Sequence, residues 1–164
     1  MALYILGAGK YGKEIEDVAE QTNQFTSIRF LDDKLEIKLS NFEGFVGEDS
    51  EFYVAFGDNE LRGKWCSAVK AAGGKLSTII HPTAYVSPKA TIEPGTAILP
   101  KAVVNTYSII EEGSIINTGA IVDHDTTIGK AAHICVGAIV KADNHIPSGM
   151  KVEAGVVIER GEYK

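Results

Sequence analysis

Residues 84–101 read AYVSPK, ATIEPG and TAILPK, three consecutive six-residue units whose third residue is a branched aliphatic. The spacing continues without a miss through thirteen residues: Val86, Ile92, Ile98, Val104, Ile110, Ile116, Val122, Ile128, Ile134, Val140, Ile146, Val152 and Ile158. A small side chain stands two residues before most of them. One aliphatic and one small residue per unit are typical of a flat strand and a tight corner, three to a coil. The pattern predicts a left-handed parallel β-helix.

The thirteen units amount to about 4.3 coils, because three units close one triangular coil. Neighbouring coils lie about 4.8 Å apart, so the prism is only about 21 Å tall. A column this short has two open ends and much apolar surface for its size. We therefore expect it to be capped or assembled into an oligomer.

The N-terminal part of the chain follows a different pattern, in which apolar strand-like runs alternate with helical ones. The expected strands are 3–6, 27–31, 52–56 and 76–80, and the expected helices run from Gly12 to about residue 22 and from 60 to 71. Strands that alternate with helices form a parallel sheet. The sequence predicts an α/β, Rossmann-like subdomain over residues 1–80, followed by the all-β left-handed β-helix over residues 81–164.

Composition excludes several classes of protein. The 164 residues carry 16 Lys and Arg against 22 Asp and Glu, and this net charge of −6 argues against a nucleic-acid partner. No apolar run approaches the roughly 18 residues of a membrane-spanning helix, and Met1 leads directly into a strand without a secretory leader, so we expect a cytoplasmic protein. Cys66 and Cys135 form no disulfide framework and are expected to be reduced.

A glycine-rich turn joins the first strand to the first helix. Residues 7–12 read GAGKYG, which places Gly7, Gly9 and Gly12 in the spacing G-x-G-x-x-G, and Asp32 ends the second expected strand. In that setting the helix N-terminus holds a diphosphate and the carboxylate reaches a ribose hydroxyl. The motif predicts phosphate binding, with a purely structural turn as the alternative. A complete dinucleotide is disfavoured, because a second mononucleotide half is absent.

Other polar residues carry weaker signals. Asn59 and Arg62 follow the third strand, at the edge where open α/β sheets bind ligands, and Arg62 either assists a phosphate or faces solvent. His81 and His145 are expected to be structural. A zinc site with three histidines is disfavoured, because the spacings around His133 do not stack three of them on one corner.

His124 is the sharpest polar feature of the repeats. It follows the inward-facing Val122 by two residues, so it lies at a corner and points outward between Asp123 and Asp125. A histidine beside a carboxylate suits a general base, because its pKa lies near neutrality and the partner stabilises the imidazolium. A solvated surface histidine is the alternative reading.

Two more positions extend this hypothesis. Ala142 follows His124 by three units of the repeat, one full coil, so its backbone N–H lies where the oxyanion of a thioester would need a donor. His133 lies half a coil from His124, and the two cannot meet within one prism. They can meet across the groove between two prisms around a threefold axis, so we expect a homotrimer with shared sites.

Motifs along nearly the whole chain resemble one family, the PglD/NeuD family of sugar acetyltransferases. They are Gly7-Ala8-Gly9-x-x-Gly12, Phe30-Leu31-Asp32-Asp33, Gly57-Asp58-Asn59-x-x-Arg62, Ile80-His81-Pro82, and Asn117-Thr118-Gly119-Ala120-Ile121-Val122-Asp123-His124-Asp125 followed by His133. The resemblance implies a small N-terminal domain that binds a UDP-linked amino sugar and a trimeric β-helix that binds acetyl-CoA between subunits. It implies an N-acetyltransferase of bacterial surface-glycan biosynthesis that needs no metal.

The resemblance also implies roles for individual residues. His124 corresponds to the catalytic base and Asp125 to its supporting acid, whereas His133 and Ala142 match positions that contact the acetyl group and the thioester of acetyl-CoA. Only two coils follow His124, so we expect a measurable but weakened affinity for CoA. The residues implied to bind the nucleotide sugar are Gly7, Gly9, Lys10, Tyr11, Gly12, Asp32, Asp33, Asn59 and Arg62, with Lys10 and Tyr11 standing where the family has Gly and His.

Three alternatives remain at this stage. A nicotinamide-dependent enzyme would use the glycine motif to bind NAD. An O-acetyltransferase would act on a sugar hydroxyl or on sialic acid. A non-catalytic trimeric scaffold would leave the pair formed by His124 and Asp125 without a use.

Overall fold

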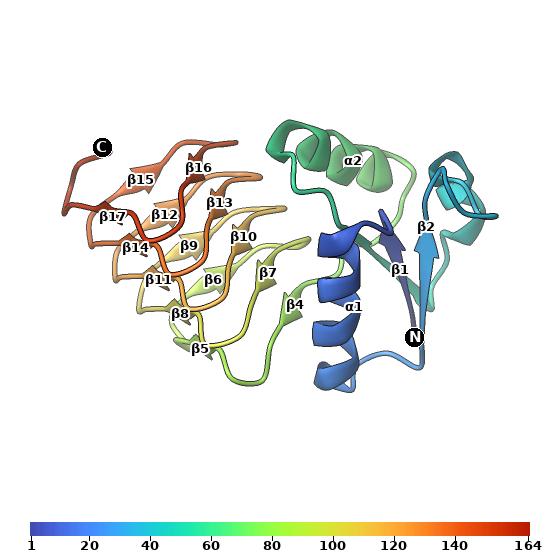
Figure 1. Ribbon diagram of the computed structural model, residues 1–164, viewed down its shortest axis with the longest axis horizontal. Coiled ribbons are helices and arrows are strands. Elements are labelled where there is room, and N and C mark those ends of the chain that lie inside the picture. Colours follow the sequence, from blue (N-terminus) through green and yellow to red (C-terminus); the bar gives the residue numbers. More distant parts are fainter.

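The computed structural model describes residues 1–164 and places two units one after the other along the long axis of the molecule (Figure 1). The N-terminal unit is a three-stranded parallel sheet in the order β2-β1-β3 with two α-helices and a 3-10 helix. Its elements are β1 (Ala2–Leu6), α1 (Lys10–Thr22), β2 (Ser27–Leu31), η1 (Leu39–Phe45), β3 (Ser50–Val54) and α2 (Asn59–Ala71). Asp58 caps α2 by accepting the N–H of Leu61 at 2.7 Å, so the helix begins soon after β3.

The second unit is the predicted left-handed β-helix. Fourteen two-residue strands form three parallel sheets, in the orders β4-β7-β10-β13-β16, β5-β8-β11-β14-β17 and β6-β9-β12-β15. Each strand pairs with the equivalent strand of the next coil, as Val122 pairs with Val140. The strands are β4 (Ile79–Ile80), β5 (Tyr85–Val86), β6 (Thr91–Ile92), β7 (Ala97–Ile98), β8 (Val103–Val104), β9 (Ile109–Ile110), β10 (Ile115–Ile116), β11 (Ile121–Val122), β12 (Thr127–Ile128), β13 (His133–Ile134), β14 (Ile139–Val140), β15 (His145–Ile146), β16 (Lys151–Val152) and β17 (Val157–Ile158).

The aliphatic series fills the interior of the prism, as predicted. Every member from Ile98 to Ile158 is buried in one core, and Val86 and Ile92 pack partly buried against it in the first coil. Ile80 also packs against this core, which extends the register by one unit toward the N-terminus. Tyr163 covers the other end, where its carbonyl accepts the N–H of His145 at 2.8 Å.

The corners share one backbone conformation. From Gly95 to Gly161, the residue three positions after each interior aliphatic has a positive φ. Seven of these twelve corner residues are glycine, which adopts this left-handed region without steric cost. The exceptions include Asp125 and Asp143, with φ of 53° and 60°.

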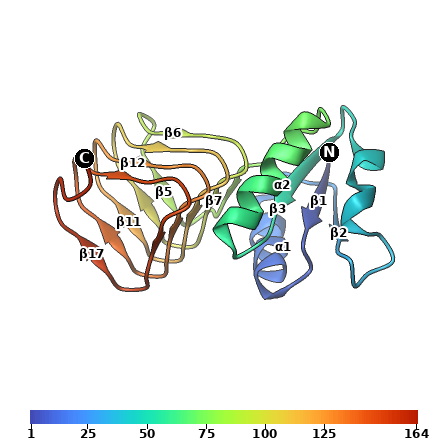
Figure 2. The same ribbon diagram turned by 90° about the horizontal axis from the view of Figure 1, so that it is seen from above.

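The two units share a hydrophobic core. Helix α1 lies between the small sheet and the β-helix (Figure 1), and its buried side chains pack with Leu3 on one side and with Ile79 and Ile115 on the other. Figure 2 shows α2 beside the β-helix as well. His133 and Lys151 continue the outward column of Ile79 and Ile115 along the same sheet, and they lie outside this shared core.

The prediction of a fourth strand of the N-terminal sheet at residues 76–80 is wrong. Only Leu76 bridges β3, at Phe52, whereas β4 pairs with β7 in the β-helix. The six-residue register already holds at Ile80, whose side chain packs against the β-helix core, so β4 belongs to the β-helix. The division of the chain into two domains at residue 80 stays a prediction.

Neither α-helix has the length and apolar composition that crossing a bilayer would require.

Candidate active site

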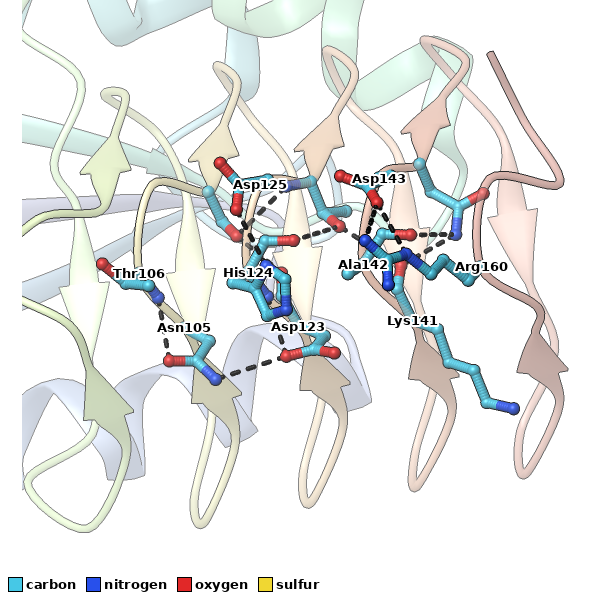
Figure 3. A network of polar contacts seen from close by, with 12 residues as sticks. Asn105, Thr106, Asp123, His124, Asp125, Lys141, Ala142, Asp143 and Arg160 are labelled. Atoms are coloured by element: carbon cyan, nitrogen blue, oxygen red, sulfur yellow. Dashed lines mark hydrogen bonds and ion pairs between the residues drawn. The ribbon is translucent and has the colours of Figure 1, made fainter.

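His124 lies at the corner between β11 and β12, with its ring open to solvent (Figure 3). Its Nδ1 atom is 2.8 Å from Oδ2 of Asp125. The left-handed backbone of Asp125 brings this carboxylate beside the ring of the preceding residue. The hydrogen bond with Asp125 raises the pKa of His124, and the charges of Asp123 and Asp143 act in the same direction.

This contact orients the imidazole for proton transfer. With Nδ1–H donating to Asp125, the neutral ring keeps its lone pair on Nε2, which has no hydrogen-bond partner in the protein. The carboxylate also stabilises the imidazolium once Nε2 takes up a proton.

Asp123 supports the backbone instead of the ring. Its Oδ1 accepts the backbone N–H of His124 at 2.8 Å and Nδ2 of Asn105, one coil earlier, at 3.3 Å. Asp125 is therefore the aspartate that contacts the imidazole, a choice that the sequence left open.

Ala142 occupies the same corner one coil after His124, because β11 and β14 pair in register. In the two earlier coils, the N–H at this position donates to the side-chain oxygen of the preceding residue, as Thr106 does to an asparagine and His124 does to Asp123. The residue before Ala142 is Lys141, which offers no acceptor (Figure 3). The Ala142 N–H is left without an acceptor in the protein.

A second backbone contact is missing at this corner. The N–H of Asp125 donates to the carbonyl of Thr106 at 3.1 Å, and that of Gly161 donates to the carbonyl of Ala142 at 3.2 Å. The equivalent N–H of Asp143 has no such bond. The N–H groups of Ala142 and Asp143 therefore lie unpaired one coil after His124. Ala142 is itself buried, and an unpaired backbone donor on a buried residue is rare, so this pair suits a ligand that carries an oxygen.

Arg160 continues the stack one coil further on. Its Nε and Nη2 atoms lie 2.7 and 2.6 Å from Oδ2 of Asp143. This ion pair is exposed and places a cation beside the two unpaired N–H groups (Figure 3). The sequence contains the information that places Asp143 and Arg160 at this corner, since residues one coil apart share a corner, but neither residue is among the sequence predictions.

His133 lies on another face of the prism, on β13, and the chain does not bring it to His124. Its Nε2 atom is 2.9 Å from Nδ2 of Asn117. With the amide as donor, Nδ1 carries the ring proton, and this buried atom has no partner. Burial lowers the pKa of His133 to about 4, and the nearby cations of Arg62 and Lys151 add to the effect. His133 is a neutral donor that lacks an acceptor within its own chain.

The glycine turn has the geometry that its sequence predicts. Gly7 has φ of 106°, and a Cβ there would lie 3.1 Å from the carbonyl oxygen of Ala55. A Cβ on Gly12 would lie 2.0 Å from the Gly7 carbonyl oxygen, so helix and strand approach too closely for any side chain. Gly9 precedes α1 without a side-chain cap, which leaves the N-terminus of the helix open.

Asp32 orders this turn. Its Oδ2 accepts the N–H of Ala8 at 2.8 Å and its Oδ1 that of Lys34 at 2.9 Å, and these bonds, the first above all, lower the pKa of Asp32. Asp33 accepts the N–H of Leu39 at 3.2 Å. Lys10 is exposed at the start of α1. These groups gather at the carboxyl edge of the sheet.

Two residues expected at the nucleotide sugar have other contacts. The Tyr11 hydroxyl lies 2.7 Å from that of Tyr53, and burial raises the pKa of Tyr11. Arg62 is fully buried and donates only to protein oxygens, so its guanidinium does not reach a phosphate. Asn59 is half-buried and hydrogen-bonded to both units. The sequence could not anticipate these contacts, because their partners lie far away along the chain.

His81 has the structural role expected of it. Its Nδ1 accepts from the N–H of Thr83 at 3.0 Å, and its Nε2 lies 3.0 Å from Oε1 of Gln21. No group of three or more His, Cys, Asp and Glu side chains is arranged to hold a metal ion.

A left-handed β-helix of hexapeptide repeats, joined to a small α/β unit, is the architecture of hexapeptide-repeat acetyltransferases. Comparison with known proteins identifies the family of this chain. The family model described as the PglD N-terminal domain matches residues 2–69. The acetyltransferase domain of PglB from Neisseria gonorrhoeae, also solved in complex with acetyl coenzyme A, is 30% identical over 96% of this chain and 91% of that one, with a TM-score of 0.83.

Two other structures are similar over most of their length. PerB from Caulobacter crescentus, solved with CoA and GDP-perosamine, is 25% identical over 97% of this chain and 92% of that one, with a TM-score of 0.76. WeeI from Acinetobacter baumannii has a TM-score of 0.88 at 20% identity, over 97% of this chain and 81% of that one, and so shares the fold. The chain belongs to the PglD/NeuD family of sugar acetyltransferases, and it is an acetyltransferase.

Proposed function

We propose that the protein transfers the acetyl group of acetyl-CoA to the amine of a nucleotide-linked amino sugar, with His124 as general base. The observation that carries this proposal is the pair formed by His124 and Asp125, one coil from the unpaired N–H of Ala142. A relative bound to CoA and GDP-perosamine supports the two substrate classes. The sequence resemblance favours UDP as the nucleotide, and GDP enters as the second candidate.

The residues of this corner have three roles in the reaction: they stabilise the oxyanion, accept a proton and return it to the leaving group. The amine attacks the thioester carbon, a C–N bond forms, and the carbonyl oxygen becomes an oxyanion that the Ala142 N–H stabilises. Nε2 of His124 takes the proton that the amine loses, while Asp125 stabilises the imidazolium. The C–S bond then breaks, and the proton passes from His124 to the sulfur of the departing CoA.

The assembly completes the site. The outward column of Tyr85, Val103, Ile121, Ile139 and Val157 is apolar apart from the Tyr85 hydroxyl, and its first, middle and last residues are 55%, 36% and 43% exposed. A second copy of the chain suits this surface, and three copies close a ring. In such a homotrimer His133 of one copy approaches His124 of the next. The resemblance of His133 to the position that contacts the acetyl group supports this arrangement.

The acceptor nucleotide fits the N-terminal unit. The open N-terminus of α1 and the Gly7–Gly12 turn offer N–H groups to a diphosphate. Lys10 adds a positive charge there, and Asp32 and Asp33 lie at the same edge for ribose hydroxyls.

A transfer assay tests the proposal. Purified protein, acetyl-CoA and a panel of GDP- and UDP-linked amino sugars are incubated together, and products are identified by mass spectrometry. We expect one acetyl group to be added to the amine of one nucleotide sugar, with release of one CoA. Acetylation of a matched sugar that carries a hydroxyl in place of the amine would instead favour O-acetyl transfer. Absence of transfer in a folded protein that also fails to bind CoA would favour a scaffold.

A further inference from the structure

The guanidinium of Arg62 lies fully buried between the two units, without a carboxylate partner. Nε donates to the carbonyl of Gly113 at 2.7 Å, and Nη2 donates to the carbonyl of Ala131 at 2.7 Å. Nη1 donates to the carbonyl of Phe56 at 2.9 Å, and Nη2 also to Oδ1 of Asn59 at 2.8 Å. One side chain thus ties the loop after β3 to two coils of the β-helix.

These β-helix contacts form a ladder. Gly113, Ala131 and Gly149 are the same corner in three successive coils, with φ of 70°, 52° and 71°. Arg62 holds the first two carbonyls, and Nδ2 of Asn59 donates to the third at 3.0 Å. The first turn of α2 therefore spans three coils through repeated geometry.

The ladder connects two parts of the proposed site. The loop after β3 touches the glycine turn, since a Cβ on Gly7 would meet the ring of Phe56 at 3.1 Å. On the other side, Ala131 lies two residues before His133, and Nη2 of Arg62 is also 3.4 Å from the carbonyl of Ala132. Arg62 thus lies between the nucleotide-binding edge and the β13 strand that carries His133.

We infer that Arg62, held by Asn59, is a positioning residue that fixes the nucleotide-binding edge relative to His133 and the reacting amine. The inference rests on the proposed function. A guanidinium suits the task because its planar fork serves four differently placed oxygens at once, which the single ammonium of lysine cannot do. Misplacement of the acceptor by about 1 Å can cost on the order of 10²-fold in rate.

The test separates positioning from binding. In Arg62→Lys we expect kcat for the nucleotide-linked acceptor to fall by roughly 10- to 100-fold. The calorimetric Kd of the free nucleoside diphosphate and the KM for acetyl-CoA should stay close to the wild-type values, because the groups that bind them are intact. Val69→Ala is the matched control: it loosens the same helix at a fully buried position away from the ladder, and kcat should hold.

Two results would overturn the inference. One is an unchanged kcat in Arg62→Lys. The other is a loss of nucleotide affinity as large as the loss of rate, which would mean that Arg62 only stabilises the nucleotide-binding loop. If Arg62→Lys does not fold, Asn59→Ala removes the contact to Gly149 and one acceptor of Arg62, and it should show a smaller loss of the same kind. A wild-type protein that acetylates no nucleotide sugar would overturn the proposed function itself.

Discussion

Replacing Ala142 by proline deletes the backbone N–H that the mechanism assigns to the oxyanion. The β-helix already holds proline at this position of its repeat, since Pro88, Pro94 and Pro100 each follow an interior aliphatic by two residues, as Ala142 follows Val140. Pro88 even belongs to the same corner, three coils earlier. Because the Ala142 N–H has no acceptor in the protein, its removal breaks no hydrogen bond of the fold.

The expected effect is large on the rate and small on stability. Loss of one oxyanion donor costs roughly 10²- to 10³-fold in kcat, about 2.7–4 kcal/mol of transition-state stabilisation. The assay follows thiol release from acetyl-CoA with a chromogenic disulfide at saturating acceptor, and circular dichroism compares the melting midpoints. Ala154→Pro is the control, because Ala154 has the same position in its unit and an unpaired N–H far along the chain from His124. A folded Ala142→Pro protein with kcat close to that of wild type would refute the assignment.

Three further predictions address the base, the glycine turn and the assembly. Asp125→Asn keeps a residue that tolerates the left-handed corner but removes the carboxylate whose hydrogen bond raises the pKa of His124. Since the proposed base must be neutral, the acidic limb of the kcat/KM profile should move to lower pH, and an unmoved limb would contradict the pairing. Gly12→Ala should cost at least about 1–3 kcal/mol and lower the melting midpoint, whereas Gly9→Ala, where a Cβ has open space, should not; equal midpoints would mean that the turn relaxes freely. Ile139→Asp should convert the proposed homotrimer to monomers in light scattering, and a trimer that stays intact would place the interface elsewhere.

The repeat region was readable from sequence because its geometry is local and periodic. The register that begins at Val86 fixed the interior, and the corner of His124 followed from its distance to Val122. Ala142 followed from the coil length alone. Strand pairing from one coil to the next is the same at every step, so one unit predicts the next.

The remaining features depend on contacts between segments far apart in the chain. Nothing near Arg62 indicates that its partners are carbonyls at Gly113 and Ala131, 51 and 69 residues away. Tyr11 likewise meets Tyr53 only once α1 docks on the sheet. The sequence shows that Lys141 has no acceptor side chain where the coil before it has Asp123. This difference gains a meaning only from the structure, in which Asp123 accepts the backbone N–H of His124.

The turnover of His124→Ala with the acceptor identified in the transfer assay is the most direct test of the account. Among the side chains of its corner, His124 combines an imidazole ring, an exposed nitrogen and an adjacent carboxylate that raises the pKa of the ring. We predict a fall in kcat of roughly 10²- to 10⁴-fold, with the affinities for acetyl-CoA and the nucleotide sugar nearly unchanged, because the residue binds little of either ground state. A His124→Ala protein that acetylates this amino sugar at the wild-type rate would contradict the account.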